Sequence, residues 1–292
     1  MSFSLEVKDA LCRMPCEKAC CMACEISAIL TVGADPAPDG SRVVSTEHAA
    51  FAGRLFKMLK ALTGTHPVLH YKRETNLKKH MLYKVILPSE TVKAIRQDPE
   101  PRRSCCRKAW LRGAFLAGGS MVHPEKGYHL EITCPDRSTA EKIADRMKGF
   151  GLHPGTAARS SGYIVYIKES ANISDFLNLT GAHGALMVFE NVRIMKDVRN
   201  SVNRIVNCET ANLDKTVEAS RRQRECILKL ISRGGADDLP HNLRQIAILR
   251  LEHPEASLEE LGKYLRPPLG KSGVNHRLKK IEMLAGLPNP GK

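Results

Sequence analysis

Residues 20–34 read CCMACEISAILTVGA, and residues 105–119 read CCRKAWLRGAFLAGG. Aligned without a gap, the two segments match in an initial Cys-Cys pair, in the apolar positions that follow it and in a final pair of small residues. A pattern that recurs at a fixed spacing is typical of an internal duplication. We therefore predict that the first two thirds of the chain contain two copies of one structural unit.

The same order of elements is predicted after each segment, namely a short strand, a helix, two further strands and a short helix. The last strand of each copy is the clearest, because it is rich in β-branched and aromatic residues. Elements of the first copy are predicted at Arg42–Glu47, His48–Leu62, Met81–Leu87 and Ser89–Arg96, and those of the second at Tyr128–Thr133, Ser138–Phe150, Tyr163–Lys168 and Ser170–Leu179. The sequence thus predicts an α+β fold with two α/β repeats about a pseudo-twofold axis.

Small residues recur in both duplicated segments at the spacing that lets two helices approach closely. They are Ser27, Ala28, Gly33 and Ala34 in the first copy and Gly113, Ala114, Ala117 and Gly118 in the second. Their matching placement favours a paired-helix interface over two ordinary buried helices.

Within these segments, ISAILTVGA at Ile26–Ala34 and LRGAFLAGG at Leu111–Gly119 resemble degenerate versions of the LAGLIDADG motif of homing endonucleases. Together with NCETANLDKT at Asn207–Thr216 and PPLGKSGVNHRL at Pro267–Leu278, they make the whole chain similar to the WhiA family of sporulation and cell-division regulators. The resemblance implies LAGLIDADG-like repeats at residues 1–98 and 99–190. It further implies a linker with long helices at 191–235 and a helix-turn-helix DNA-binding domain at 236–288.

The resemblance also locates the catalytic positions of the nuclease family, where an acidic residue at the end of each motif helix holds a divalent metal. Here those positions fall on Gly33 and Gly118, which have no side chain to offer. Asp35 lies two residues beyond the first position in an Ala-Asp-Pro sequence and is interpreted as a loop carboxylate. No catalytic residue is therefore predicted. An active homing-type endonuclease is a less favoured alternative, and a histidine-based nuclease would use residues without a clear ligand spacing, His66, His70, Asn76 and His80.

The formal net charge of +14 makes polyanions the favoured class of partner. Phosphate contacts from the repeats are predicted for basic residues on or beside the strands, namely Lys72, Arg73, Lys78, Lys79, Lys84, Arg159 and Lys168. A basic solvated face, or a surface that recognises protein, would explain the same residues.

The chain has ten cysteines and its N-terminus lacks the apolar core of a secretory signal, so reduced thiols are expected. The spacing of one group would permit a four-thiolate zinc or iron–sulfur site: Cys12, Cys16, Cys20 and Cys24. Pro15 argues against that site, because it interrupts any helix that would carry all four thiols. The pairs Cys20-Cys21 and Cys105-Cys106 recur at one point of the repeat, which indicates structural placement. We expect small buried hydrophobic residues, with no metal and no cofactor.

The last part of the chain is predicted to be helical, at Val217–Ser232, at Asn242–Leu251 and from Ser257 to Leu265. Ser257 and Glu260 have the spacing of a capping box. Ser272 is expected to cap a final helix. That helix would bury a stripe consisting of Val274, Leu278 and Ile281.

The outer face of this final helix is the predicted recognition surface for DNA. Asn275, His276 and Lys279 point away from the buried stripe near the helix start, where side chains can reach base edges in the major groove. The residues expected to surround them at the phosphates are Lys271, Arg277 and Lys280, and Ser272 is also placed among the DNA-binding residues. The connection from Arg266 to Lys271 is longer than the usual turn of this motif. A small helical dimerisation domain with a basic face is the alternative.

These observations predict a sequence-specific transcription regulator that binds promoters as double-stranded DNA. The family resemblance implies that its targets are cell-division and sporulation genes. By the family resemblance, candidate protein partners are a WhiB-like iron–sulfur protein and RNA polymerase. No stretch approaches the roughly 20 apolar residues that span a bilayer, so a cytoplasmic, nucleoid-associated protein without membrane contact is expected. The alternative from another class is a chromosome-segregation or scaffold protein that binds DNA without sequence preference.

Overall fold

The computed structural model describes residues 2–64, 66–74, 80–96, 103–233 and 239–286. The chain divides into two compact units, Met1–Asp197 and Val198–Lys292. None of the helices within the described residues is both long and apolar enough to cross a membrane.

The first unit begins with a helix that the sequence patterns above do not predict, α1 (Phe3–Arg13). Phe3, Val7 and Leu11 form its buried stripe, one turn apart, as expected of a helix that packs on one side. Ser2 caps the helix, because its side chain accepts a hydrogen bond of 3.4 Å from the amide of Leu5. The spacing of four residues between these apolar side chains is the feature of the sequence from which α1 could have been predicted.

Two repeats follow, each with the predicted elements in the predicted order and one further short strand directly after the first helix. The first consists of α2 (Ala19–Gly33), β1 (Ala34–Pro36), β2 (Arg42–Thr46), α3 (Ala49–Thr63), β3 (Val68–Glu74), β4 (His80–Leu87) and α4 (Ser89–Arg96). The second consists of α5 (Ser104–Gly118), β5 (Gly119–Met121), β6 (Leu130–Cys134), α6 (Arg137–Lys148), β7 (Gly155–Arg159), β8 (Gly162–Ile167) and α7 (Ser170–Thr180). Both sheets are antiparallel, with the equivalent strand orders β1-β2-β4-β3 and β5-β6-β8-β7. The duplicated α/β unit is confirmed.

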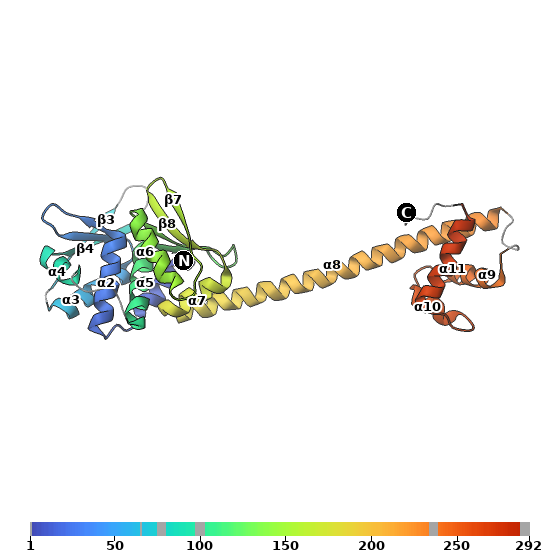
Figure 1. Cartoon of the computed structure of the whole chain (residues 1–292), viewed down its shortest axis with the longest axis horizontal. Coiled ribbons are helices and arrows are strands. Elements are labelled where there is room, and N and C mark those ends of the chain that lie inside the picture. The colour runs from blue at the N-terminus through green and yellow to red at the C-terminus, as the bar shows by residue number, and fades with distance from the viewer. Residues whose placement is uncertain (1, 65, 75–79, 97–102, 234–238, 287–292) are drawn as a thin grey trace. The chain divides into compact units, whose positions relative to one another are not determined.

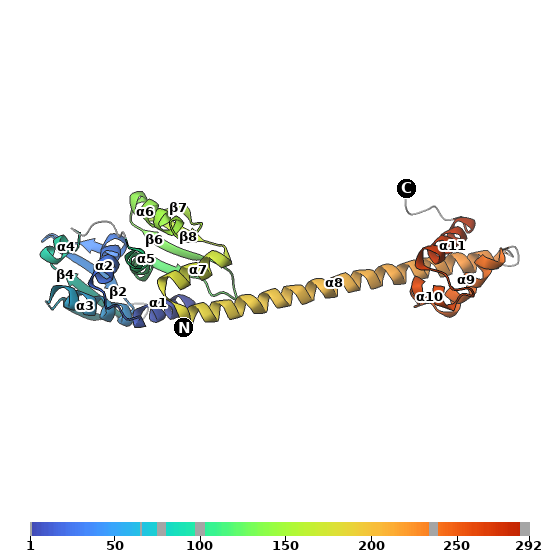
Figure 2. The ribbon, with the colours of Figure 1, turned by 60° about the horizontal axis from the view of Figure 1, so that its bottom comes forward.

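Helices α2 and α5, which carry the duplicated segments, lie side by side between the two sheets (Figure 1 and Figure 2). Gly113 allows this close packing, because a Cβ atom there would lie 2.3 Å from the carbonyl oxygen of Glu25 and 3.1 Å from Cβ of Ala28. Toward the other end of the pair, a Cβ at Gly33 would lie 3.1 Å from that of Ala117. The small residues therefore form the interface between the repeats, as predicted.

A buried carboxylate at this interface is paired with two arginines. Glu25 of α2 is fully buried and accepts hydrogen bonds from Arg54 Nε at 2.5 Å and from Arg112 Nη1 at 3.1 Å. Arg112, on α5, also donates from Nε to the carbonyl oxygen of Thr180 at 2.8 Å. Because these partners belong to both repeats, the cluster joins them and satisfies a charge that would be costly to bury alone.

After α7, residues 183–232 form a single helix of 50 residues, α8 (His183–Ser232), which spans the boundary between the units. The predicted helix at Val217–Ser232 is its last part, and the linker with long helices expected at 191–235 is continuous with it as far as Ser232. No glycine or proline occurs between Ala185 and Ser232, so the sequence contains no residue that would end the helix earlier.

In the second unit, the end of α8 packs with α9 (His241–Glu252), α10 (Leu258–Tyr264) and α11 (Lys271–Leu284). Their core is aliphatic and consists of Ile227, Leu243, Ile246, Ala247, Leu261, Leu265, Val274, Leu278 and Ile281. The predicted capping box is present at α10, with Ser257 N donating to Glu260 Oε2 at 2.7 Å and Glu260 N to Ser257 Oγ at 3.2 Å. The all-α module after the repeats is therefore confirmed.

The predicted cap of the final helix is wrong. Gly270 occupies the N-cap position of α11 and no side chain caps it, while Ser272 is exposed in the first turn. The helix starts before Ser272 because Gly270 already has the extended backbone of an N-cap residue.

Candidate nucleic-acid interface

Helix α11 has a buried side and an exposed side that match the sequence pattern. Val274 and Leu278 are fully buried, and Ile281 is 1% exposed. The exposed residues near the helix start are Lys271, Ser272, His276, Lys279 and Lys280. The start of α11 thus presents cations and hydrogen-bonding groups to solvent, as the recognition helix of a helix-turn-helix requires.

The long connection between α10 and α11 packs against both helices through Leu269. The amide of Leu269 donates to the carbonyl oxygen of Gly262 at 3.0 Å. A Cβ at Gly262 would lie 2.0 Å from the Leu269 carbonyl oxygen, and one at Gly273 would lie 2.7 Å from Cγ of Leu269. Leu269 is therefore held between two glycines, and this contact fixes how the two helices cross.

The outward residues of α11 do not all have the same surroundings. Asn275 is half-buried and lines a cavity of about 310 Å³ together with Lys279 and residues of α8, while His276 is exposed. Glu282 lies at the same cavity and accepts a hydrogen bond of 3.3 Å from Arg222 Nε of α8. Asn275 therefore points along the side of α11 that faces α8, and His276 along the open side.

Two further residues of the motif have structural partners. Arg277 is half-buried, and its Nη1 donates to the carbonyl oxygen of Asn242 at 3.4 Å, so part of its role is to hold α9 and α11 together. At the start of α10, the hydrogen bond from the backbone of Ser257 lowers the pKa of Glu260, which keeps this carboxylate charged and the capping box closed.

In the first repeat, the register of β3 and β4 places the basic residues predicted to contact phosphate on two different faces of the sheet. Lys84 pairs with His70 and Lys72 with Leu82, so both lysines lie on the face opposite the buried Val85. Arg73 pairs with Met81 and lies on the other face of the same sheet. Lys78, Lys79 and Asn76 lie outside the described residues.

In the second repeat, one of the predicted basic residues, Lys168, lies over an aromatic ring. The Lys168 ammonium is 5.0 Å from the ring centroid of Tyr166, and the ring of His129 stacks on the same tyrosine with the two ring centroids 5.9 Å apart. Arg159 is exposed at the end of β7. Cations and a ring on one sheet face can contact a nucleic-acid backbone.

The two glycines predicted to replace catalytic acids lie at the ends of the paired helices. Gly118 ends α5, and a Cβ there would lie 2.4 Å from the carbonyl oxygen of Thr133 and 2.8 Å from Cγ1 of Val32. Gly33 ends α2. Asp35 is exposed in strand β1, paired with Val43, rather than in a turn. At Gly118 the chain therefore lacks both the acidic side chain and the space for one.

Comparison with known protein families finds a separate WhiA domain match for each repeat and for the C-terminal helices. Residues 19–99 match the WhiA N-terminal LAGLIDADG-like domain, residues 107–199 the WhiA LAGLIDADG-like domain and residues 202–285 the WhiA C-terminal HTH domain. The chain belongs to the WhiA family. A "Probable cell division protein WhiA" of Ruminiclostridium cellulolyticum is 46% identical over 305 residues, 98% of this chain and 97% of that protein. A WhiA protein of the same description from Heliobacterium modesticaldum is 44% identical over 306 residues, 98% of this chain and 96% of its own length.

Solved WhiA structures have the same fold. The crystal structure of full-length DUF199/WhiA from Thermatoga maritima is 28% identical, matches 98% of each chain and gives a TM-score of 0.65. The N-terminal LAGLIDADG domain of DUF199/WhiA, at 24% identity, matches 62% of this chain and 90% of its own with a TM-score of 0.56. The predicted family and fold, two LAGLIDADG-like repeats followed by a helix-turn-helix domain, are confirmed.

One residue that supports the WhiA helix-turn-helix was missed in the sequence. Arg250 of α9 is 2% exposed and donates from Nη1 to the carbonyl oxygen of Ala256 at 2.7 Å, which holds the turn before α10. Burial lowers the pKa of this guanidinium. Its position one turn after Ile246 and Ala247, on the buried stripe of α9, was the available signal.

Proposed function

We propose that this chain is a sequence-specific transcription regulator that binds promoter DNA and controls cell-division and sporulation genes. The observation that carries the proposal is the exposed, basic start of α11 on a helix whose opposite side is buried. Association with the nucleoid follows from such a role.

Direct contacts to base edges are assigned to Asn275, His276 and Lys279. His276 is the most open of the three, and Asn275 reaches DNA from the side of α11 next to the cavity. Phosphate contacts are assigned to residues around them, namely Lys271, Ser272, Arg277 and Lys280. The first turn of α11 adds free backbone amides, which favour a phosphate at that end.

The repeats are proposed to assist by contacting the DNA backbone. Lys72 and Lys84 share one face of the first sheet, and Arg159 and Lys168 lie at the second sheet. Arg73 is left out of this set, since it lies on the other face of its strand.

The nuclease activity of the LAGLIDADG fold is proposed to be lost, so that the chain is not an enzyme. Support comes from Gly118, where the closeness of the Thr133 carbonyl oxygen leaves no room for a metal-binding carboxylate. The domain limits given above, and a WhiB-like iron–sulfur protein or RNA polymerase as partner, stay predictions.

The experiment compares binding of the full chain to promoter fragments of cell-division genes and to random DNA at one salt concentration. A sequence-specific regulator prefers its own sites by roughly 10³-fold or more. A scaffold or chromosome-segregation protein would bind both with similar affinity. Incubating the same DNA with Mg²⁺ completes the test, because cleavage would show that nuclease activity persists.

A further inference from the structure

Four thiols from the two repeats meet where α2 and α5 begin. The Sγ atoms of Cys20, Cys21 and Cys106 all lie within 4.8 Å of one another. Cys105 Sγ is 3.9 Å from Cys106 Sγ. We call these four residues the thiol cluster. Among the described residues they include the one group of three or more histidine, cysteine or acidic side chains whose ligand atoms lie this close together.

The contacts within the thiol cluster follow the internal duplication. Cys20 corresponds to Cys105 in the aligned segments, and Cys21 corresponds to Cys106. The Cys21 thiol lies next to Cys105, and the Cys106 thiol lies next to Cys20. Each contact is the counterpart of the other in the opposite repeat, so the cluster lies at the pseudo-twofold axis.

This arrangement has the symmetry and size of a tetrahedral metal site. A tetrahedron of four ligands contains twofold axes that exchange the ligands in pairs. With zinc–sulfur bonds of about 2.3 Å, neighbouring sulfurs lie roughly 3.8 Å apart. The Cys105–Cys106 separation of 3.9 Å meets this value, and the sulfurs of Cys20, Cys21 and Cys106, which lie within 4.8 Å of one another, need to close by about 1 Å at most. A two-iron cluster would instead separate the thiols into two pairs.

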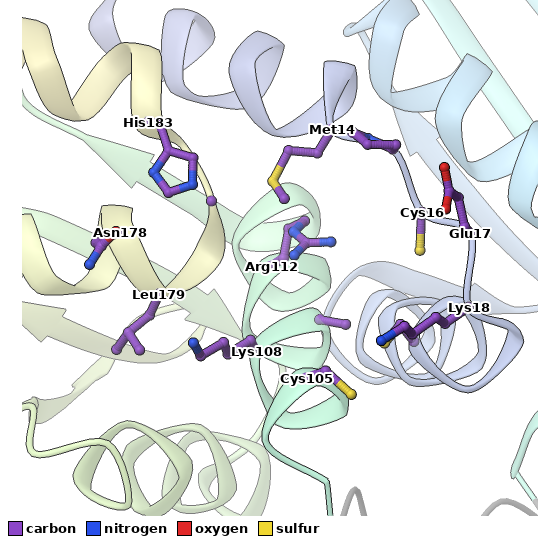
Figure 3. Close-up of a pocket in the computed structure, with 14 residues that line it drawn as sticks. Met14, Cys16, Glu17, Lys18, Cys105, Lys108, Arg112, Asn178, Leu179 and His183 are labelled. Carbon is purple, nitrogen blue, oxygen red and sulfur yellow. The ribbon is translucent and has the colours of Figure 1, made fainter.

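The surroundings of the thiol cluster also suit a bound cation. Cys21 and Cys105 line a cavity of about 500 Å³, which gives an ion a route from solvent. Lys18 and Lys108 line the same cavity and can offset the negative charge of four thiolates (Figure 3). Cys16 also lies at the cavity, but it does not belong to the close group of sulfurs.

We propose that Cys20, Cys21, Cys105 and Cys106 bind one Zn²⁺ ion as a structural site that joins the two repeats. All four positions of the metal are filled by protein ligands, as in closed structural zinc sites. The ligand set differs from the one that the N-terminal spacing suggested, because only Cys20 is common to both.

The test is a titration of the full chain with Co²⁺ after purification under reducing conditions and removal of metal. One equivalent is expected to produce the visible bands of tetrahedral cobalt and the near-ultraviolet band of thiolate-to-cobalt charge transfer. Zn²⁺ is expected to abolish both. Zn²⁺ should also raise the melting temperature of the metal-free chain, because a ligand that binds only the folded state stabilises it.

Serine variants identify the ligands. Cys105→Ser and Cys20→Ser remove partly buried thiols, so both should retain the parent's helical circular dichroism. Each is expected to weaken metal binding by roughly tenfold or more and to reduce the charge-transfer band. Cys208→Ser is the control, because that thiol is exposed on α8 and should leave the titration unchanged.

Several results would overturn the proposal. One is a Co²⁺ titration without tetrahedral bands, although all ten cysteines of the chain react with a thiol reagent as free thiols. Another is a Co²⁺ titration that is the same in the parent, Cys20→Ser and Cys105→Ser. Iron with acid-labile sulfide in the purified protein would point to an iron–sulfur cluster instead. Disulfides between the four cysteines in reductant would show that the thiols pair with each other rather than with a metal.

Discussion

At the residue scale, Gly118 and Glu25 set the character of the N-terminal unit. Gly118 lets the end of α5 approach β6 so closely that a methyl group would meet the Thr133 carbonyl oxygen at 2.4 Å. Glu25, in the middle of α2, is fully buried between Arg54 and Arg112. The missing acid at Gly118 was readable from the sequence alone. The partners of Glu25 were not, because they lie on α3 and α5, far along the chain, and only the fold brings them together.

Placing an acid at this position with Gly118→Asp should not produce DNA cleavage. The new side chain would push against the backbone of β6, which should destabilise the chain by about 1–3 kcal/mol. Chemical denaturation measures the free energy of unfolding. Gly127→Asp is the matched control, because a Cβ there meets nothing within 4 Å. Mg²⁺-dependent cutting by the Gly118→Asp variant would contradict the account of this position.

Replacing Arg112 by alanine should destabilise the N-terminal unit by roughly 3–5 kcal/mol, because it leaves part of a buried carboxylate without its charged partner. Arg137→Ala breaks an exposed pair with Glu141 at 2.8 Å and should cost at most about 1 kcal/mol. Thermal unfolding of the two variants provides the comparison. Equal losses of stability would show that the buried cluster does not support the fold.

At the element scale, the apolar periodicity of the C-terminal helices predicts which side of a helix is buried but not where the helix begins or ends. The buried stripe of α11 and the capping box of α10 were predicted and are confirmed. The N-cap of α11 was predicted wrongly, because the sequence before Val274 offers both Gly270 and Ser272 and the backbone decides between them. Long helices were predicted at 191–235, but that they form one continuous helix, α8, was not predicted.

These two helix starts give a matched pair of serine substitutions. Ser257→Ala removes a side chain that accepts the Glu260 amide and should cost about 1 kcal/mol. Ser272→Ala removes a hydroxyl that caps nothing and should leave stability unchanged within about 0.5 kcal/mol. The free energy of unfolding of each variant is the measurement. A larger loss for Ser272→Ala would contradict the assignment of Gly270 as the cap.

At the scale of the whole molecule, the net charge is +14, and in the proposed function basic residues of both units contact DNA. The composition predicted a polyanionic partner but could not show which cations share a surface. The register of β3 and β4 supplies that information for the first repeat, where Lys72 and Lys84 lie together and Arg73 does not. The meeting of the two Cys-Cys pairs was equally beyond the sequence, because it depends on how α2 and α5 pack.

A phosphate contact can be recognised by its salt dependence. Lys280→Ala should weaken binding to promoter and random DNA alike, and should reduce the slope of log affinity against log salt by about 1. Lys84→Ala should do the same if the first repeat contacts DNA. Lys229→Ala, an exposed lysine on α8, is the control. An unchanged slope for Lys280→Ala would remove that residue from the interface.

The outward side of α11 is proposed to read DNA sequence. The direct measurement is the ratio of affinities for promoter and random DNA, at one salt concentration, for the parent, Asn275→Ala and Lys279→Ala. Both substitutions are predicted to cost about 1–3 kcal/mol on the promoter and little on random DNA, so the ratio falls. A ratio that stays at the parent's value in both variants would contradict the claim.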